Sequence, residues 1–389
     1  MQTSSSTATW RQTNIGSVCR LINGRAYKKS ELLDAGKYRV LRVGNFFTSD
    51  HWYFSNLELE PDKYCSSGDL LYAWSASFGP RFWAGEKSIF HYHIWKVDPD
   101  PAKVTKEFLF YFFEWDKDKI RDEQGAGATM VHVSKTSMEA RRISLPSLSE
   151  QKRIVAILDQ AFAALDRARA HAEANLADID ELLEISKTQL LQQAGKLGRS
   201  VSFSEVVSIE SSLVDPKLPE NIDLPHLGAG NMVTNSDALL NVQTAREEKL
   251  KSGKHTFEPG MVLYSKIRPY LKKVARPDFR GLCSADVYPL STSSELDRDF
   301  LFHMLLGRDF TDYAISGSDR AGMPKVNRAH LFRYRFSLPP LEVQKEVARN
   351  IDAVMATTTK VASHYQAKLA DLAQLRQSLL QQAFSGKLT

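Results

Sequence analysis

The chain has 389 residues, of which 43% are hydrophobic and 25% charged, and its formal net charge is +5. This length predicts two or three domains with sizeable cores. The three cysteines, Cys19, Cys65 and Cys283, form no CxxC pair and have no histidine at zinc-finger spacing, which argues against a structural disulfide or zinc site. The polar start MQTSSSTATW lacks a signal-peptide core, and the longest apolar burst, FLFYFF from Phe108, is too short to span a bilayer. We therefore expect a cytoplasmic protein that does not contact a membrane.

The first segment reads as an α+β domain with a twisted sheet. Short runs rich in β-forming residues, KYRVLRV, DLLYAW and HYHIWKV, alternate with glycines and turns and predict strands. The FLF stretch predicts a buried helix. His91 and His93 lie close together, but no third ligand is near them in the sequence, so we expect no metal site.

Three stretches of this segment are candidates for contact with nucleic acid. Cations neutralise phosphates, aromatic rings offer flat contacts, and glycines allow a backbone to approach a partner closely. No segment is polybasic, so these residues would have to gather on one face. Ordinary exposed surface, or a tight turn that closes the domain, is the alternative for each. The candidates are Arg25, Tyr27, Lys28 and Lys29; Trp74, Ser75 and Arg81; and, in the glycine loop QGAGATMVHVSK, His132, Ser134 and Lys135.

A nearly repeated stretch follows the first segment. SLPSLSEQKRIVAILD begins at Ser144, and SLPPLEVQKEVARNID begins at Ser337, 193 positions later. A period of half the chain predicts two equivalent halves. Each LP is a point from which a helix cannot extend backwards, and Ser147 with Glu150 fits a capping box.

Each repeat leads into an apolar seam. Spacings that alternate between three and four residues over about four heptads predict a coiled coil, so each stretch should be a long helix that packs on the other. We assign helix pairing and partner docking to Gln151, Leu158, Phe162, Leu165, Leu176, Ile179 and Leu183 in the first copy, and to Gln344, Ile351, Met355, Tyr365, Leu369 and Leu372 in the second, whose seam continues to Leu375 and Leu379.

The two helices cannot be perfect copies near their ends. LLQQAGKL starts at Leu190 and LLQQAFSGKL at Leu379, so the first helix carries four extra residues, which we place near Glu184 to Lys187. Such an insertion is a stutter that locally unwinds a coiled coil. Because a globular segment joins the helices, we expect them to pair antiparallel, with one domain at each end and a pseudo-twofold axis across the pair.

The second segment weakly resembles the first. LGAGN ending at Asn231 corresponds to LRVGN ending at Asn45, and GMVLYSK from Gly260 corresponds to GDLLYAW from Gly68. Its most basic stretch is KIRPYLKKVARPDFR, in which an Arg can fork onto guanine and Lys can bind phosphate, although a solvated strand and turn would also explain it. The candidates are Lys266, Arg268, Tyr270, Lys272 and Lys273, and, after a second glycine loop, Lys325, Asn327 and Arg328, with Asn327 a candidate reader of adenine.

Motifs for catalysis are absent from the sequence. GAG at Gly228 lacks the rest of a dinucleotide site, and there is no GxxxxGK[ST]. Pro339 and Pro340 are not followed by an aromatic residue, as they would be in a methyltransferase that modifies the amino group of a flipped base. We assign no catalytic or metal-binding residue. The alternatives are a coiled-coil protein scaffold and an unrecognised DNA nuclease or methyltransferase.

Taken together, the duplicated LPxLxxQK before long helices, GxxLYSKIRPY and the closing LLQQAFSGKLT resemble the specificity subunit of type I restriction-modification systems. The resemblance covers essentially the whole chain. It implies target recognition domains at 1–145 and 199–338, spacer helices at 146–198 and 339–389, and a split DNA target of which each domain reads one half. It also implies double-stranded DNA, two methyltransferase subunits and restriction/translocase subunits as partners, with S-adenosylmethionine on the methyltransferase and no cofactor on this chain.

Overall fold

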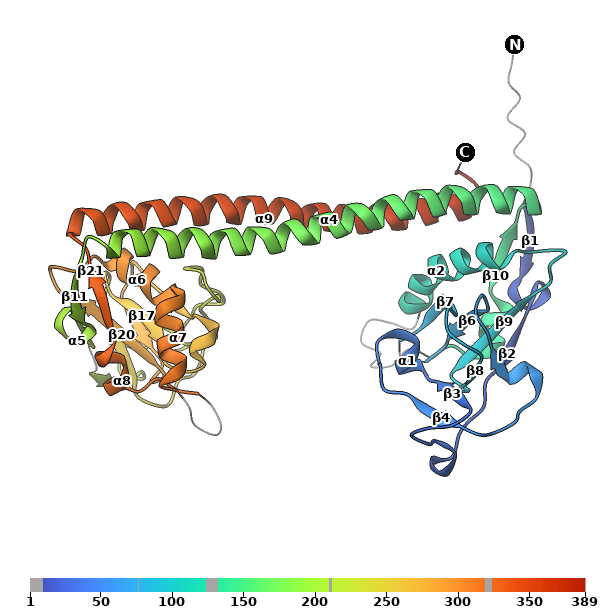
Figure 1. The fold of residues 1–389 in the computed structure, drawn as a ribbon, viewed down its shortest axis with the longest axis horizontal. Coiled ribbons are helices and arrows are strands. Elements are labelled where there is room, and N and C mark those ends of the chain that lie inside the picture. The colour runs from blue at the N-terminus through green and yellow to red at the C-terminus, as the bar shows by residue number, and fades with distance from the viewer. Residues whose placement is uncertain (1–9, 76, 124–131, 210–211, 319–323, 389) are drawn as a thin grey trace, which may run out of the picture. The chain divides into compact units, whose positions relative to one another are not determined.

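The computed structural model describes residues 10–75, 77–123, 132–209, 212–318 and 324–388. The chain forms two compact units, residues 1–171 with 368–389 and residues 172–367. Two long helices, α4 (Leu148–Gly195) and α9 (Leu341–Phe384), run through both units, and each unit also contains an α+β domain (Figure 1). In the described ranges, no helix combines the length and the apolar character that crossing a membrane requires.

The domain of the first unit contains two four-stranded sheets and a covering helix. Helix α2 buries Phe108, Phe112 and Phe113 on the antiparallel sheet β2-β9-β6-β7, against Tyr72 and Trp95. In the second sheet, β4-β3-β8-β5, the pair β3 and β8 is parallel. The elements are β1 (Arg11–Asn14), β2 (Cys19–Asn23), β3 (Tyr38–Leu41), α1 (Val43–Phe47), β4 (Tyr53–Ser55), β5 (Tyr64–Cys65), β6 (Leu70–Ala73), β7 (Gly79–Phe82), β8 (Ser88–Phe90), β9 (Ile94–Pro99), α2 (Lys106–Glu123), α3 (Lys135–Ala140) and β10 (Arg142–Leu145).

The domain of the second unit repeats this plan. Its sheet β12-β20-β17-β18 corresponds to β2-β9-β6-β7, and its second sheet, β13-β16-β19-β14-β15, again has one parallel pair, β14 with β19. The elements are β11 (Arg199–Ser202), α5 (Phe203–Val206), β12 (Val207–Ile209), β13 (Leu213–Val214), β14 (Pro225–Leu227), β15 (Gln243–Thr244), β16 (Lys254–Phe257), β17 (Val262–Ser265), β18 (Val274–Ala275), β19 (Gly281–Cys283), β20 (Val287–Thr292), α6 (Arg298–Leu306), α7 (Arg308–Ser316), α8 (Arg328–Arg333) and β21 (Arg335–Leu338). The three predicted strands of the first segment are confirmed in part, since the first ends at Leu41 and the third begins at Ile94, and the predicted FLF helix is confirmed as α2.

Each domain starts and ends on one short antiparallel ladder. In the first, β1 pairs with β10, so Arg11 lies opposite Leu145. In the second, β11 pairs with β21, so Arg199 lies opposite Leu338. The last strand of each ladder leads directly into the following helix.

The helices begin and pair as the repeat predicts. The Ser147 hydroxyl accepts a hydrogen bond from the Glu150 N–H (3.3 Å) at the start of α4. In the first unit, Arg153 bonds to the Leu388 carbonyl and Asp166 pairs with Arg376, so the two helices run antiparallel. In the second unit, Asn175 bonds to Tyr365, while Ala194 shares a core with Val347, which gives the same direction.

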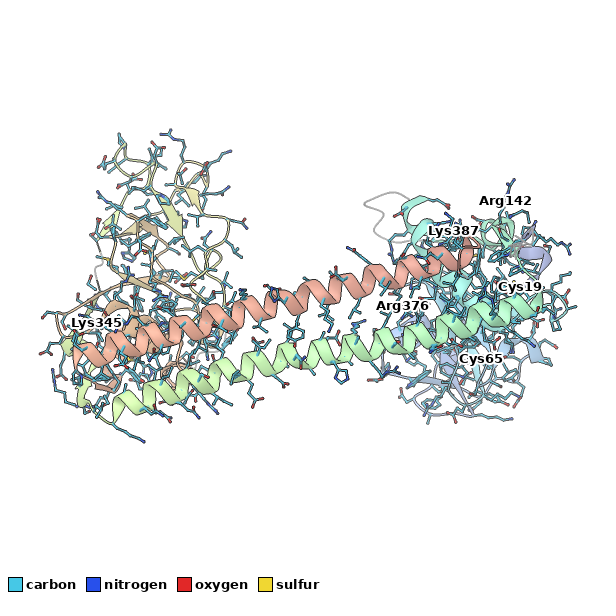
Figure 2. All side chains as sticks on the ribbon, turned by 90° about the horizontal axis from the view of Figure 1, so that it is seen from above. Cys19, Cys65, Arg142, Lys345, Arg376 and Lys387 are labelled. Carbon is cyan, nitrogen blue, oxygen red and sulfur yellow. The ribbon has the colours of Figure 1, made fainter. Side chains whose placement is uncertain are left out.

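The seam differs from the prediction near the end of each helix. Leu375 is 47% exposed, and Arg376 takes the inward position, with its guanidinium carbon 3.9 Å from the centre of the Phe162 ring (Figure 2). On α4, Lys187 is only 1% exposed and continues the seam one step later than a strict heptad would. The four-residue insertion is thus accommodated by turning Lys187 inward.

The three cysteine thiols are free and buried. Burial raises the pKa of each of them, Cys19, Cys65 and Cys283, to about 12. Cys19 and Cys65, which Figure 2 labels, belong to cores of the first domain, and Cys283 belongs to a core of the second.

Candidate nucleic-acid interface

The first basic loop is partly neutralised by its own carboxylate. Arg25 donates two hydrogen bonds to Glu31 (3.0 and 2.8 Å), and these bonds lower the pKa of Glu31. The Tyr27 hydroxyl bonds to the Phe90 carbonyl. Lys28 and Lys29 remain exposed. Among the cations of this loop, Lys28 and Lys29 therefore offer the charge that Glu31 does not neutralise.

The structure brings Trp74, Ser75 and His132 together, although the last two are 57 positions apart. Ser75 and His132 form an isolated β-bridge, and the Trp74 and His132 ring centres lie 6.0 Å apart. The indole N–H of Trp74 donates to the Tyr92 carbonyl (2.8 Å). Ser75 is 3% exposed, so the prediction that it contacts DNA is wrong, because packing occupies its side chain.

The predicted loop residues Ser134 and Asn327 are helix caps. The Ser134 hydroxyl accepts a hydrogen bond from the Ser137 N–H (3.1 Å) at the start of α3, and the Asn327 carbonyl oxygen accepts one from the His330 N–H (2.8 Å) at the start of α8. Such caps satisfy helix N–H groups that lack an internal partner. Both residues therefore have a local structural role, as the alternative to DNA contact expects. The side-chain oxygen of Asn327, which would have to accept a hydrogen bond from adenine, is already bonded to the His330 N–H. Of the glycines of both loops, those at 125, 127 and 322 lie outside the described residues, whereas Gly317 directly follows α7.

The cations beside these caps differ in their surroundings. Lys135 is exposed and lies 3.7 Å from Glu139. Lys325 pairs with Asp286 (2.9 Å), and its strand neighbour across an isolated bridge is Ile267. The guanidinium of Arg328 is exposed and lies over the Phe332 ring at 5.3 Å.

The basic run of the second domain divides into an outward and an inward group. Arg268 and Tyr270 are exposed, the latter by 53%, and Arg268 adopts a left-handed conformation with φ of 49°. Its N–H bonds to the Pro324 carbonyl, which fixes this turn beside Lys325. The outward group can therefore meet a partner from a rigid position.

The three lysines of the run bond to acceptors within the protein, which corrects the prediction that they contact DNA. Lys266 has a side chain only 14% exposed, its ammonium bonds to the Ala285 carbonyl, and burial followed by repulsion from Lys325 lowers its pKa. Lys273 bonds to the Ala229 carbonyl (2.6 Å). Lys272 forms an ion pair with Glu184 of α4 (2.7 Å). All three are held by internal acceptors rather than offered to phosphates.

Lys272 belongs to a charge cluster that attaches the domain to α4. Glu184 accepts hydrogen bonds from Lys187, Lys272 and the Asn235 amide, and Lys187 also donates to the Asn235 oxygen (2.8 Å). Burial opposes ionisation of Glu184, but the bonds from Lys187 and Lys272 lower its pKa to about 2. The first and the last of the extra helix residues, Glu184 and Lys187, are thus tied to the domain.

A second cluster attaches the same domain to α9. Asp352 accepts hydrogen bonds from Arg276 (2.6 Å) and from His303 (3.0 Å), and His303 is fully buried. In the first unit, the equivalent pair is Asp159 with Tyr111, which are linked by a hydrogen bond. The helix-to-domain attachment is therefore built at the same positions in both units.

Comparison with known proteins gives the family. A model described as "Type I restriction modification DNA specificity domain" matches residues 8–174 and again residues 200–369. The chain belongs to this family. The two matches coincide with the two similar domains and the adjoining parts of the helices.

Relatives and solved structures extend over nearly the whole chain. The type I restriction enzyme EcoDI specificity subunit of Escherichia coli is 27% identical over 98% of this chain and 89% of its own length, and the StySPI subunit of Salmonella potsdam is 23% identical over the same shares. A solved chain described under "complex assembly and conformational transition of the type I R-M system" matches with a TM-score of 0.78 at 18% identity, covering 98% of this chain and 99% of that one. The HsdS subunit of Thermoanaerobacter tengcongensis matches with a TM-score of 0.55 at 17% identity, covering 98% of each chain. The fold of the two specificity domains with long helices is therefore shared.

The duplicated glutamine of the specificity chain is a clamp between domain and helix. Gln151 accepts from the Thr105 N–H (3.0 Å) and donates to the Lys103 and Pro146 carbonyls (2.9 and 3.0 Å). Gln344 does the same with the Asp297 N–H and the Glu295 and Pro339 carbonyls, at 2.8, 2.9 and 2.8 Å. Both side chains are 0% exposed. The assignment of both glutamines to docking or helix pairing is corrected, because every polar atom of each amide is engaged by its own domain.

The apolar residues assigned to the helices pack in two ways. Leu158, Phe162 and Leu165 join the core of the first specificity domain, and Ile351 and Met355 join that of the second. The residues between are half-buried in the helix pair, namely Leu176, Ile179, Leu183, Tyr365, Leu369 and Leu372. Sites for a partner must therefore be sought among other residues of the helices.

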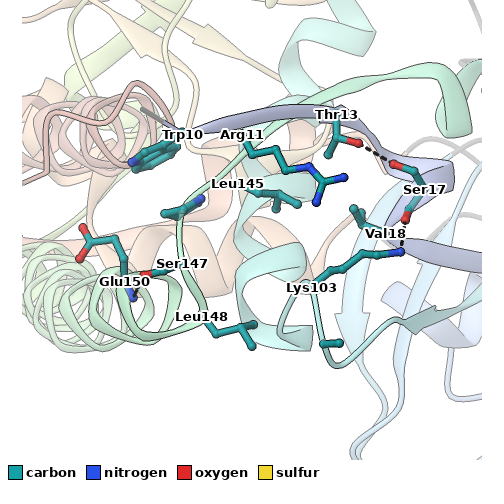
Figure 3. Close-up of a pocket in the computed structure, with 12 residues that line it drawn as sticks. Trp10, Arg11, Thr13, Ser17, Val18, Lys103, Leu145, Ser147, Leu148 and Glu150 are labelled. Atoms are coloured by element: carbon teal, nitrogen blue, oxygen red, sulfur yellow. Dashed lines mark hydrogen bonds between the residues drawn. The ribbon is translucent and has the colours of Figure 1, made fainter. Parts of the chain in front are cut away.

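A cavity of about 350 Å³ lies where α4 leaves the first specificity domain (Figure 3). Trp10, Arg11 and Glu150 line it, and the Lys103 ammonium bonds to the Ser17 carbonyl at its edge. None of the residues predicted to bind DNA lines it.

Arg42 was missed by the sequence reasoning. Its guanidinium lies over the Tyr53 ring at 5.3 Å, and that of the predicted Arg81 lies over Phe47 at 5.3 Å. Arg42 also lines a cavity of about 270 Å³ with Asn45, His51, Tyr53, His91 and His93 among others. The strand predicted from His91 begins instead at Ile94, which places His91 and His93 in a turn at this cavity. Across the described part of the chain, no group of three or more His, Cys, Asp or Glu is arranged to hold a metal ion.

Proposed function

We propose that this chain is the DNA-recognition subunit of a type I restriction-modification complex and that each specificity domain reads one half of a bipartite duplex target. The observation that carries the proposal is the double family match on two domains of one fold that expose different cations. The first domain exposes Lys28, Lys29 and Arg81, and the second exposes Arg268 and Arg328. Because base choice depends on such side chains, one fold with two surfaces supports two different half-sites.

The proposal assigns assembly to the helices. Two methyltransferase subunits would dock on α4 and α9, restriction/translocase subunits would join through the complex, and S-adenosylmethionine would bind to the methyltransferase rather than to this chain. Exposed apolar side chains on the helices support such docking, since they lie outside the seam: Leu182 (57%), Ile185 (45%) and Val361 (38%). The length of the helices would set the unread spacer.

A binding selection tests the proposal. The full-length chain, alone and with its methyltransferase subunit, is incubated with duplexes that carry two randomised windows at varied separations. We expect two enriched windows at one preferred spacing and an affinity that falls steeply with salt. Replacing residues 199–338 with the matching domain of a relative should change one window and preserve the other.

Two results would contradict this function. Absence of salt-dependent DNA affinity would favour a protein scaffold. Binding of S-adenosylmethionine or a divalent metal by the isolated chain, measured by calorimetry, would favour an enzyme.

A further inference from the structure

In the first specificity domain, several arginines are compensated by carboxylates, and two others lie over aromatic rings without such a partner. Arg25, Arg39 and Arg141 form ion pairs with Glu31, Glu86 and Asp116. Arg42 and Arg81 instead lie over Tyr53 and Phe47, and the described residues place no carboxylate within ion-pair distance of either. A ring that covers the face of a guanidinium orients it and leaves the N–H edge available.

Arg42 differs from Arg81 in that it stands at a cavity. It directly follows β3 and precedes α1, and with His51, His91 and His93 it lines the 270 Å³ space described above. The Asn45 amide donates to the Ser49 and His51 carbonyls (3.1 and 2.6 Å), which fixes the loop that carries His51. The His51 ring also packs edge-on against Tyr53, with centres 4.8 Å apart. The site around Arg42 is therefore held in shape before any partner arrives.

Two histidines of this cavity, His91 and His93, add hydrogen-bonding groups beside the charge of Arg42. Burial, then the nearby His93, and then Arg42 lower the pKa of His91 to about 4. Burial also lowers the pKa of His93. A neutral imidazole has one donor and one acceptor, so these two rings can bond to polar groups of a base while Arg42 supplies positive charge.

The second specificity domain has no such arginine at this place. LRVGN of the first domain corresponds to LGAGN of the second, so Gly228 stands where the first has Arg42. One exposed arginine of the second domain, Arg268, comes instead from the turn after β17. The two domains thus carry uncompensated arginines on different elements of one fold.

We infer that Arg42 is a specificity-determining residue of the first domain and that it reads a guanine in the major groove of one half-site. A guanidinium presented edge-on forms two hydrogen bonds to O6 and N7 of guanine, which no other base offers together. The inference rests on the proposed function, because it requires the first domain to meet DNA. It adds the residue and the base to that function.

The test compares Arg42→Ala and Arg42→Lys with a matched control in the selection on the full-length chain. Arg39→Ala is the control, because Arg39 lies on β3, which Arg42 directly follows, and its guanidinium lies over Trp52 at 5.4 Å but pairs with Glu86 at 3.0 Å. We expect both Arg42 variants to lose preference for guanine at one position of one window, by about 5- to 150-fold. The second window and all other positions should stay unchanged, and the control should keep both windows.

The outcomes separate the possible roles. If Arg42→Lys retained the guanine preference while Arg42→Ala weakened all sequences equally, with a salt slope lower by about 0.9, Arg42 would contact a phosphate and the inference would fail. Unchanged preference in both variants would also overturn it. A wild-type chain that selected no sequence would refute the proposed function itself, whereas an intact second window in the variants shows that they are folded.

Discussion

The attachment of the second domain to α4 should respond unequally to removal of its two charges. Lys187 is 1% exposed and depends on Glu184 (2.7 Å) and Asn235 (2.8 Å), whereas Glu184 also has Lys272 at 2.7 Å. Glu184→Ala leaves a buried ammonium with only an amide oxygen. Lys187→Met removes that ammonium, keeps an apolar stem of similar length, and leaves Glu184 paired with Lys272.

The magnitudes follow from this geometry. Removing one partner of a buried ion pair costs about 3 to 5 kcal/mol. Because the Glu184 side chain is 34% exposed, water can approach the site and we expect about 3 kcal/mol for Glu184→Ala. Replacing a buried charge by a packed apolar side chain is often nearly neutral, so Lys187→Met should cost under about 1 kcal/mol.

Urea denaturation of the full chain can measure this difference in the second unit. All six tryptophans lie in residues 1–171, so tryptophan fluorescence reports the first unit, while far-UV circular dichroism reports both. Glu184→Ala should shift only the part of the dichroism transition that fluorescence does not follow. The matched control is Glu342→Ala, which breaks an exposed pair with Lys345 at the same i,i+3 spacing (3.0 Å) and should change stability by under about 0.5 kcal/mol.

Equal losses for Glu184→Ala and Lys187→Met would refute the reasoning, since the pair would then contribute as a simple mutual attraction. A loss for Glu184→Ala no larger than that of the control would show that the cluster does not attach the domain to α4.

Three further expectations concern the clamps, acid stability and salt. Gln151→Ala should destabilise the first unit by about 3 kcal/mol in fluorescence-detected urea denaturation, because three backbone groups around the buried amide lose their partners. An unaffected midpoint would contradict the clamp. The pKa of Glu184 and of Asp352 is lowered to about 2 in the folded chain, so the stability that each carboxylate contributes is complete above its ordinary pKa, near 4.5 and 3.8, and is lost as pH falls toward 2. Asp352→Asn should therefore make the stability of the second unit, followed by dichroism, depend less on acid pH. An unchanged acid profile would argue against this role of Asp352. In DNA titrations at several salt concentrations, the double variant Lys28→Ala, Lys29→Ala should lower the salt slope by about 0.9 for each phosphate that is no longer neutralised. Lys272→Ala should leave the slope unchanged, because the Lys272 ammonium is already paired with Glu184. A slope that falls for Lys272→Ala and not for the double variant would exclude the assignment of Lys28 and Lys29 to phosphates.

The duplicated sequence was sufficient to predict the repeated domains and helices. Apolar spacing predicts which face of a helix is buried, and this held from Leu158 to Leu183 on α4 and from Ile351 to Leu372 on α9. It failed at Lys187, because a lysine carries no apolar signal although its stem fills a seam position when a carboxylate neutralises its end.

The individual DNA-binding and docking residues were harder to predict for a physical reason. The charge of Lys272 is compensated by Glu184, 88 positions away, and no local pattern reveals such a partner. Gln151 and Gln344 were assigned to helix pairing and docking, yet each bonds to two groups of the loop before α2 or α6 and to a proline carbonyl just before its own helix. Arg42 gave no basic cluster, since what distinguishes it is the ring of Tyr53 and the cavity beside it.

The ladders β1 with β10 and β11 with β21 have a consequence for how new target sequences arise. Since the two ends of each domain lie side by side, everything between them can be exchanged without moving the helix that follows. The LPxLxxQK junction that follows each domain occurs in both copies, so an exchanged domain would meet the same kind of helix start. One pair of crossovers around the coding region of a domain would then change one half of the recognition sequence in a single event. The other half would stay as it was. Such a lineage diversifies by combining half-sites, which yields many more targets than it has domains.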